Sequence, residues 1–154
     1  MSCVESSTVG ALGRGVVAGL VGTAVMTAFQ KLVEMPLTGR GDSYAPAAFA
    51  QKLLPVDVDA DSDRVNGVAH FALGAMMGAV HGLVIRAGVR GQKAVAVTFA
   101  AVYTGDLLLN TKLGLYEPGS WSKKDWAVDL VDKYVQAAAT GAVFERVLTP
   151  AAQR

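Results

Sequence analysis

The chain has 154 residues, of which 52% are hydrophobic and 18% are charged, and its mean hydropathy is +0.36. Soluble domains carry about 25% charged residues, so this composition excludes a disordered or multidomain protein and favours one compact apolar unit. The formal net charge of +1 gives no basic excess for binding nucleic acid. The single cysteine, Cys3, excludes an internal disulfide framework and a thiolate-clustered metal site.

Seventeen glycines in so apolar a chain indicate a membrane protein. Glycine weakens helices in water but is frequent in transmembrane helices, where it lets two backbones approach closely. No cation precedes the first apolar run, so we expect no cleaved secretory signal. We expect a single membrane domain over residues 1–154.

The first predicted helix covers residues 13–33. Sixteen uncharged residues separate Arg14 from Lys31, and snorkelling of these two ends extends the segment to roughly the 20 residues that a bilayer crossing needs. Small side chains recur every four residues and include Gly15 and Gly19. This spacing permits close contact with another helix in lipid.

A polar connection is predicted for residues 34–64, which contain three prolines and aspartates at alternate positions. Residues 47–54 have the pattern of a short amphipathic helix at the membrane surface. The aspartates resemble the start of a calcium-binding loop, but the glycine and glutamate that such a loop needs are missing. We interpret them as a solvated loop whose Asp61 or Asp63 caps the next helix.

Two further spans are predicted at residues 65–85 and 94–111. The former has no formal charge over twenty-one residues, and the latter is interrupted only by Asp106. The helix at 65–85 carries glycine at every fourth position, which favours close helix packing. This glycine ladder consists of Gly74, Gly78 and Gly82.

The last helix is predicted at residues 125–148 and is the least apolar. Its polar residues follow one stripe, which either faces a helix bundle or lies flat at the membrane surface; we favour the spanning interpretation. The stripe consists of Asp125, Asp129, Asp132, Gln136 and Thr140. The predicted fold is an all-α, four-helix transmembrane bundle with an irregular polar loop between helices one and two.

Four spans would place both chain ends and the second connection on one side of the membrane. That side carries six cations against two acids, whereas the other carries eight cations against eleven acids. We weight the short connection with Arg86, Arg90 and Lys93 over the raw cation count, which points the other way. We therefore expect a bacterial inner-membrane protein with both termini in the cytoplasm. Trp121 and Trp126 are typical of an interfacial aromatic belt.

Ionisable residues from four segments are expected at one level of the membrane, because the helices enter that level from the same side. Asp106, for example, lies about 18 Å along the third helix. The group, which we name the polar layer, consists of Glu34, His70, Asp106, Asp129 and Asp132. Because ionisable groups at membrane depth are costly, we interpret it as a site that binds a cation or relays protons. A divalent cation there would use His70, Asp106 and Asp129; no other cofactor is predicted.

The polar layer also has structural interpretations. Asp106 could be neutralised by Lys112 or Lys133, and Asp129 has the i,i+4 spacing of an ion pair with Lys133. Asp132 has no such partner in the sequence. Glu34 fits a solvated helix end.

The two histidines are too far apart to act together within one chain. His70 fits a hydrogen bond between helices, and His81 lies about 16 Å further along the same face. They cannot share a metal ion or a haem.

Three function classes remain: a protein that handles ions or protons, an accessory subunit that packs into a homo-oligomer or a larger membrane complex, and a membrane enzyme that uses the polar layer. Enzymatic activity is the least favoured of the three. No nucleic acid is expected as a partner.

Three features of the sequence carry a resemblance to a known family. They are the glycine-rich first span, the Ala69-His70 pair that leads into the glycine ladder, and the acid-bearing last span. On these features the chain resembles the small bacterial inner-membrane proteins of the YagU type, and it departs from them in the first loop. The resemblance implies a polytopic inner-membrane protein and carries over no established chemistry.

Overall fold

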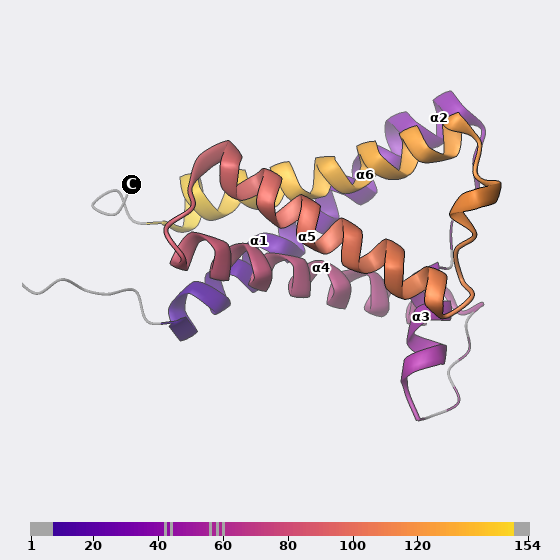
Figure 1. Ribbon diagram of the computed structural model, residues 1–154, viewed down its shortest axis with the longest axis horizontal. Helices are drawn as coiled ribbons and strands as arrows, with labels where there is room; N and C mark the ends of the chain where they lie inside the picture. The colour runs from indigo at the N-terminus through magenta and orange to yellow at the C-terminus, as the bar shows by residue number, and fades with distance from the viewer. Residues whose placement is uncertain are drawn as a thin grey trace, which may run out of the picture.

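The computed structural model describes residues 8–41, 43, 45–55, 57, 59 and 61–149, so Cys3 lies outside the described residues. Every regular element in this described part is a helix, which confirms the all-α class. Four long helices run side by side along the molecule (Figure 1). They are α1 (Thr8–Phe29), α4 (Asp63–Arg86), α5 (Gly91–Lys112) and α6 (Lys123–Ala142).

Three helical segments are long and apolar enough to cross a membrane: Thr8–Thr38, Asp63–Arg86 and Gly91–Lys112. Large apolar side chains point outward from them, for example Val68 at 73% exposure and Leu108 at 65%. Extensive exposed apolar surface is unusual for a soluble protein but suits contact with lipid. The prediction of membrane-spanning helices is confirmed for these three segments by length and composition.

The first helix continues well beyond its predicted end. A π-helical turn, η1 (Gln30–Glu34), follows α1 and leads into a further α-helical turn, α2 (Met35–Thr38). Pro36 suggested a loop because proline has no N–H to donate within a helix. The wider turn before it lets the chain remain helical until Gly39, whose φ of 71° ends the helix.

The connection that follows is less irregular than predicted. It contains a short helix, α3 (Ala45–Leu53), close to the amphipathic helix expected at residues 47–54. The helix α4 is capped by Ser62, whose side chain accepts a hydrogen bond from the backbone N–H of Val65. The prediction that Asp61 or Asp63 would cap this helix was therefore wrong.

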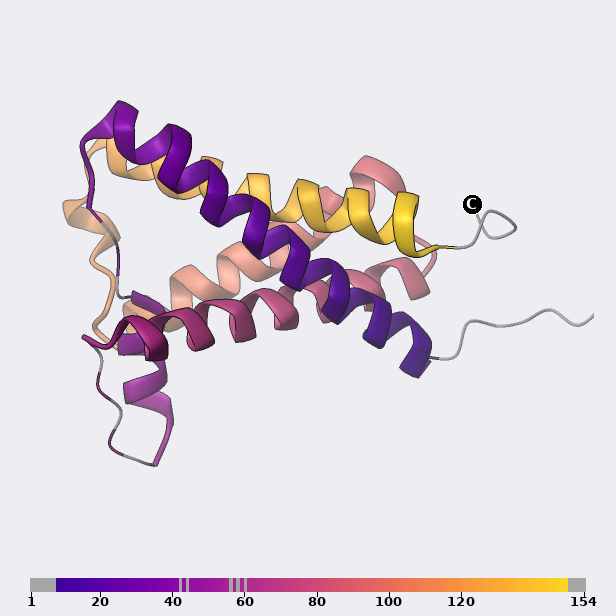
Figure 2. The same cartoon turned by 180° about the vertical axis from the view of Figure 1, so that it is seen from behind.

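The predicted glycine faces of α1 and α4 pack against each other. A Cβ atom added to Gly15 would overlap the backbone carbonyl of Gly78, and one added to Gly19 would overlap that of Gly74. A Cβ on Gly82 would meet the backbone of Ala11 in the same way. Because backbone atoms cannot swing aside, only glycine allows this approach. The two helices separate toward the end that carries α2 and α3 (Figure 2).

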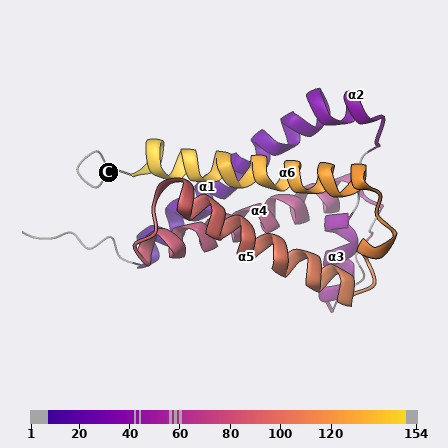
Figure 3. The same ribbon diagram turned by 45° about the horizontal axis from the view of Figure 1, so that its top comes forward.

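The polar stripe of α6 turns inward where the helix packs against α1 and α5. Asp132, Gln136 and Thr140 are buried, whereas the side chain of Asp125 near the start of the helix is 42% exposed. A second π-helical segment, η3 (Val143–Leu148), ends the helix. The beginning of α1, the connection between α4 and α5, and the end of η3 lie at one end of the molecule (Figure 3).

The opposite end carries α3 and the aromatic residues of the connection between α5 and α6. This connection contains a short 3-10 helix, η2 (Pro118–Ser120). The ring of Trp121 lies 5.3 Å from that of Tyr116 and 5.0 Å from that of Trp126, measured between centroids. The predicted interfacial aromatics therefore form one contiguous cluster.

Candidate functional site

Asp106 and Asp129 of the polar layer are joined by a lysine. Lys133 Nζ lies 3.0 Å from Asp106 Oδ2 and 2.8 Å from Asp129 Oδ1. The side chains of these residues are only about one fifth exposed, with values of 20–23%. Of the two lysines considered from the sequence, Lys133 is therefore the one that contacts Asp106. Two carboxylates and one ammonium leave this group with a formal charge of −1.

Aromatic and amide groups complete the surroundings of Lys133. The ammonium lies 5.6 Å from the ring centroid of Tyr103 and 5.5 Å from that of Tyr116, within the range of cation–π attraction. Asn110 donates a hydrogen bond to Asp106 Oδ1 at 2.8 Å. Burial raises the pKa of Tyr116, so its hydroxyl stays neutral at physiological pH.

Asp132 has a separate environment between α6 and the π-helical turn η1. Gln30 Nε2 donates a hydrogen bond to Asp132 Oδ2 at 2.8 Å. The other carboxylate oxygen, Oδ1, is buried and has no hydrogen-bond partner among the described residues. Asp132 is 7% exposed, so this oxygen cannot be satisfied by bulk water. A buried carboxylate oxygen without a partner is costly and marks a position that needs a proton or a cation.

Glu34 lies on the same π-helical turn as Gln30 and is 9% exposed. Its carboxylate accepts a hydrogen bond from the Thr38 hydroxyl at 2.6 Å. The interpretation of Glu34 as a solvated helix end is therefore wrong, because the helix continues past it and buries it. Single π-helical turns occur frequently at functional sites, and this one presents both polar side chains.

His70 bonds to α1 and not to a carboxylate in the part of the chain that the structure describes. The Thr27 hydroxyl donates its hydrogen to the carbonyl of Thr23 at 2.9 Å. Because that hydrogen is used, the bond of 3.1 Å between Thr27 Oγ1 and His70 Nε2 must be donated by the histidine. The sequence-based alternative of a hydrogen bond between helices fits this geometry.

Thr23 extends the same polar line along α1. It donates to the carbonyl of Gly19 at 2.8 Å and accepts a bond of 2.8 Å from Gln136 Nε2. Thr23, Thr27 and Gln30 thus link α1 to α4 and α6 at successive turns. Sequence analysis missed Thr27 and Gln30 as contacts of the site, although their spacing along helix one is a signal that could have revealed them.

No metal-ligand group forms among the residues that the structure describes. Three His, Cys, Asp or Glu side chains do not converge anywhere in that part of the chain. The set His70, Asp106 and Asp129 is not brought together, because Lys133 Nζ holds the two aspartates and Thr27 holds the histidine.

Comparison with known proteins gave no relative. A scan against protein-family models, a search of curated proteins and a search of solved structures each found no match to the chain. The residues and contacts described above are therefore the basis for a functional conclusion.

Proposed function

We propose that this protein is a polytopic protein of the bacterial inner membrane that handles protons or a small cation at the polar layer. The observation that carries the proposal is Asp132, whose Oδ1 atom is buried without a hydrogen-bond partner beside the π-helical turn of the first helix. Glu34 and Gln30, both on that turn, complete this candidate site. The resemblance to YagU-type proteins favours the inner membrane.

The charge of the polar layer supports this proposal. It contains four carboxylates, and Lys133 contacts two of them, Asp106 and Asp129. With His70 neutral, the polar layer and Lys133 together carry a formal charge of −3. An aspartate at the centre of a membrane helix costs roughly 2.5–3.5 kcal/mol on insertion scales. Protons or cations drawn into the layer would remove much of this cost. Uptake of positive charge is thus the chemistry that this arrangement of residues favours.

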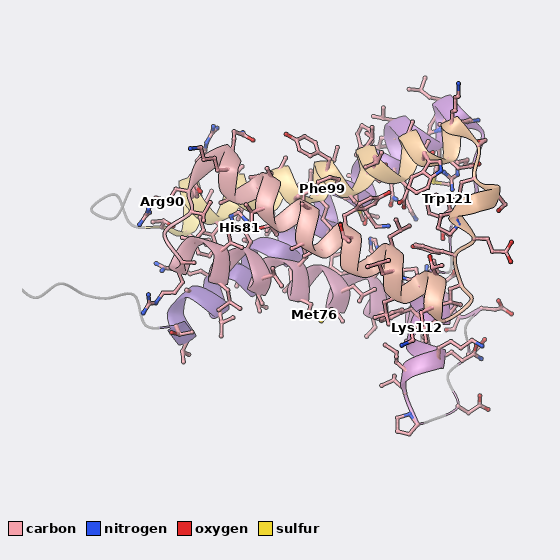
Figure 4. All side chains as sticks on the ribbon, viewed as in Figure 1. Met76, His81, Arg90, Phe99, Lys112 and Trp121 are labelled. Carbon is pink, nitrogen blue, oxygen red and sulfur yellow. The ribbon has the colours of Figure 1, made fainter. Side chains whose placement is uncertain are left out.

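The outer shape of the molecule fits four spans in a bilayer. The helix α3 projects across the long axis at the end that carries the connection between α5 and α6, where an interfacial helix would lie (Figure 1). The other end carries the connection between α4 and α5, where Arg90 lies (Figure 4). In this arrangement α6 is the fourth span, and its polar stripe is shielded from lipid by α1 and α5.

The direct test measures ion movement in proteoliposomes that contain the purified protein and a pH-sensitive dye. We expect a proton or cation flux that the Asp132→Asn variant loses while remaining folded. Asp57→Asn, an exposed aspartate of the first connection, is the matched control and should keep the flux. A wild-type protein that conducts neither protons nor alkali cations under any imposed gradient would overturn the proposal.

The accessory-subunit alternative is favoured by one observation. Lys133 binds both Asp106 and Asp129, as a purely structural ion-pair network does. The glycine ladder, however, is covered by α1 of the same chain, so a partner would have to use another surface. Absence of flux, combined with co-purification of a membrane complex that depends on this protein, would favour the alternative.

A further inference from the structure

His81 is a buried titratable residue that the polar layer does not include. It lies in the second half of α4, between α4 and α5 (Figure 4), and its side chain is 0% exposed. A hydrogen bond of 3.0 Å joins His81 Nδ1 to Thr98 Oγ1. The Phe144 ring meets the imidazole edge-on, with 5.5 Å between centroids. These contacts fix the orientation of the imidazole ring.

The second ring nitrogen, Nε2, has no hydrogen-bond partner among the described residues. It faces the backbone of α6, since a Cβ atom added to Gly141 would lie 3.6 Å from Nε2 and 2.5 Å from Val95 Cγ2. A side chain at position 141 would overlap Val95 and lie in van der Waals contact with the imidazole. The preceding residue, Thr140, is also fully buried, and its hydroxyl likewise has no partner in the described part of the chain.

The polar stripe of α6 runs from the candidate site at Asp132 toward the level of His81. Asp132, Gln136 and Thr140 follow one another at intervals of one helical turn, all on the buried face. Eight residues separate Asp132 from Thr140, which corresponds to about 12 Å along the helix axis. Gln136, halfway between them, is held by its hydrogen bond to Thr23. Buried polar groups thus extend from the polar layer toward His81.

The charged groups around His81 come from two of the elements packed near it. Glu145 of η3 is negatively charged and accepts a hydrogen bond of 2.7 Å from the Gly91 N–H. Arg14 of α1 lies 5.6 Å from the centroid of the Phe144 ring that also contacts His81, and its charge opposes protonation. From α5, the residue in contact is Thr98, which is neutral.

We propose that His81 is a second proton-binding site, which extends the path from Asp132 across the membrane along the buried face of α6. The lone pair on Nε2 accepts a proton from the α6 side, and the neutral ring becomes an imidazolium. In the tautomer with its hydrogen on Nδ1, His81 donates to Thr98 Oγ1 and the lone pair of Nε2 is free to accept. Release of that proton from Nε2 toward the end that carries Glu145 restores the neutral ring. The role of His81 in a proton path across the membrane rests on the proposed function, whereas the protonation of His81 itself does not.

The first test observes protonation in the wild-type protein by nitrogen NMR after labelling with ¹⁵N-histidine in lipid bilayers. The chain has two histidines, so His70→Gln assigns the signals. We expect the His81 signals to change reversibly from neutral imidazole to imidazolium as the pH falls. Thr98→Val should change the tautomer populations of His81. Thr111→Val is the matched control on the same helix, because its exposed hydroxyl donates to the Leu107 carbonyl, and it should leave the His81 signals unchanged.

The second test places His81→Gln in the flux assay, where we expect loss of proton flux. If His81 stays neutral at every pH at which the protein remains folded, the inference is overturned, whatever flux is measured. If flux persists unchanged in His81→Gln, the path through His81 is overturned. If His81 titrates but the wild-type protein conducts nothing, the proposed function fails and the proton-binding site at His81 is retained.

Discussion

Replacing Gly78 with alanine is the most informative perturbation of the helix packing. The added methyl group would overlap the backbone carbonyl of Gly15 and approach Gly19 N at 2.6 Å and Gly19 Cα at 2.7 Å. These are backbone atoms, so the contact can be relieved only by moving α1 away from α4. Alanine favours helix formation over glycine by about 1 kcal/mol. Overpacking typically costs about 1–3 kcal/mol, and here the neighbouring glycine contacts are lost as well.

Because the gain in helix propensity offsets part of this cost, we expect Gly78→Ala to lower the free energy of unfolding by roughly 1–2 kcal/mol, and Gly78→Ile to lower it further. Thermal unfolding in detergent, followed by circular dichroism, measures the change. Gly67→Ala is the matched control on the same helix, since a Cβ at position 67 meets nothing within 4 Å. Its stability should be unchanged or raised. If Gly78→Ala is as stable as Gly67→Ala and keeps the wild-type oligomer size, the α1–α4 contact described here is wrong.

Three further predictions concern charge, capping and topology. Lys133→Met leaves two facing carboxylates without their cation and should lower the free energy of unfolding by about 2–3 kcal/mol. Lys112→Met, at an exposed position, should change it by less than about 0.5 kcal/mol. Equal effects of the two variants in thermal unfolding would contradict the ion-pair network. Ser122→Ala removes the side chain that accepts a bond from the Asp125 N–H and should cost about 1 kcal/mol in the same assay; no change would argue against the capping box. A reporter fused after Arg154 should be active only in the cytoplasm, and activity of a periplasm-specific reporter there would reverse the topology.

Much of the helix packing could be predicted because it depends on residue size at regular spacing. Gly74, Gly78 and Gly82 lie one turn apart, and a face without side chains can pack closely against only another small-residue face. Gly15 and Gly19 supply such a face in the structure. Periodicity predicts the close packing but left open whether the partner is helix one or another subunit. The inward direction of the α6 stripe could be predicted on the same basis.

The partners of the charged residues could not be predicted in the same way. The positions of Asp106 and Asp129 along their helices predict that both lie at the same depth in the membrane. Which side chain lies between them, a lysine or a histidine, depends on how each helix is rotated about its own axis. The π-helical turn at residues 30–34 adds one residue to a turn of the first helix and changes which side chains face Asp132. Nothing in the local sequence distinguishes that turn from an ordinary α-helical one.

The spacing of the two histidines shows that His81 cannot share a metal ion with His70, but it indicates no other role for His81. Its burial depends on Gly141 and Thr98, which lie far away in the sequence and on different helices. Such convergence becomes visible only when the helices are in place.

The claim that the protein is integral to the membrane can be tested directly by membrane extraction. After expression in a bacterial host, membranes are washed with alkaline carbonate, which removes peripheral proteins but not spanning ones. With three helices long and apolar enough to cross a bilayer, the protein should remain in the pellet and enter solution only with detergent. Recovery of folded protein in the soluble fraction without detergent would contradict the account.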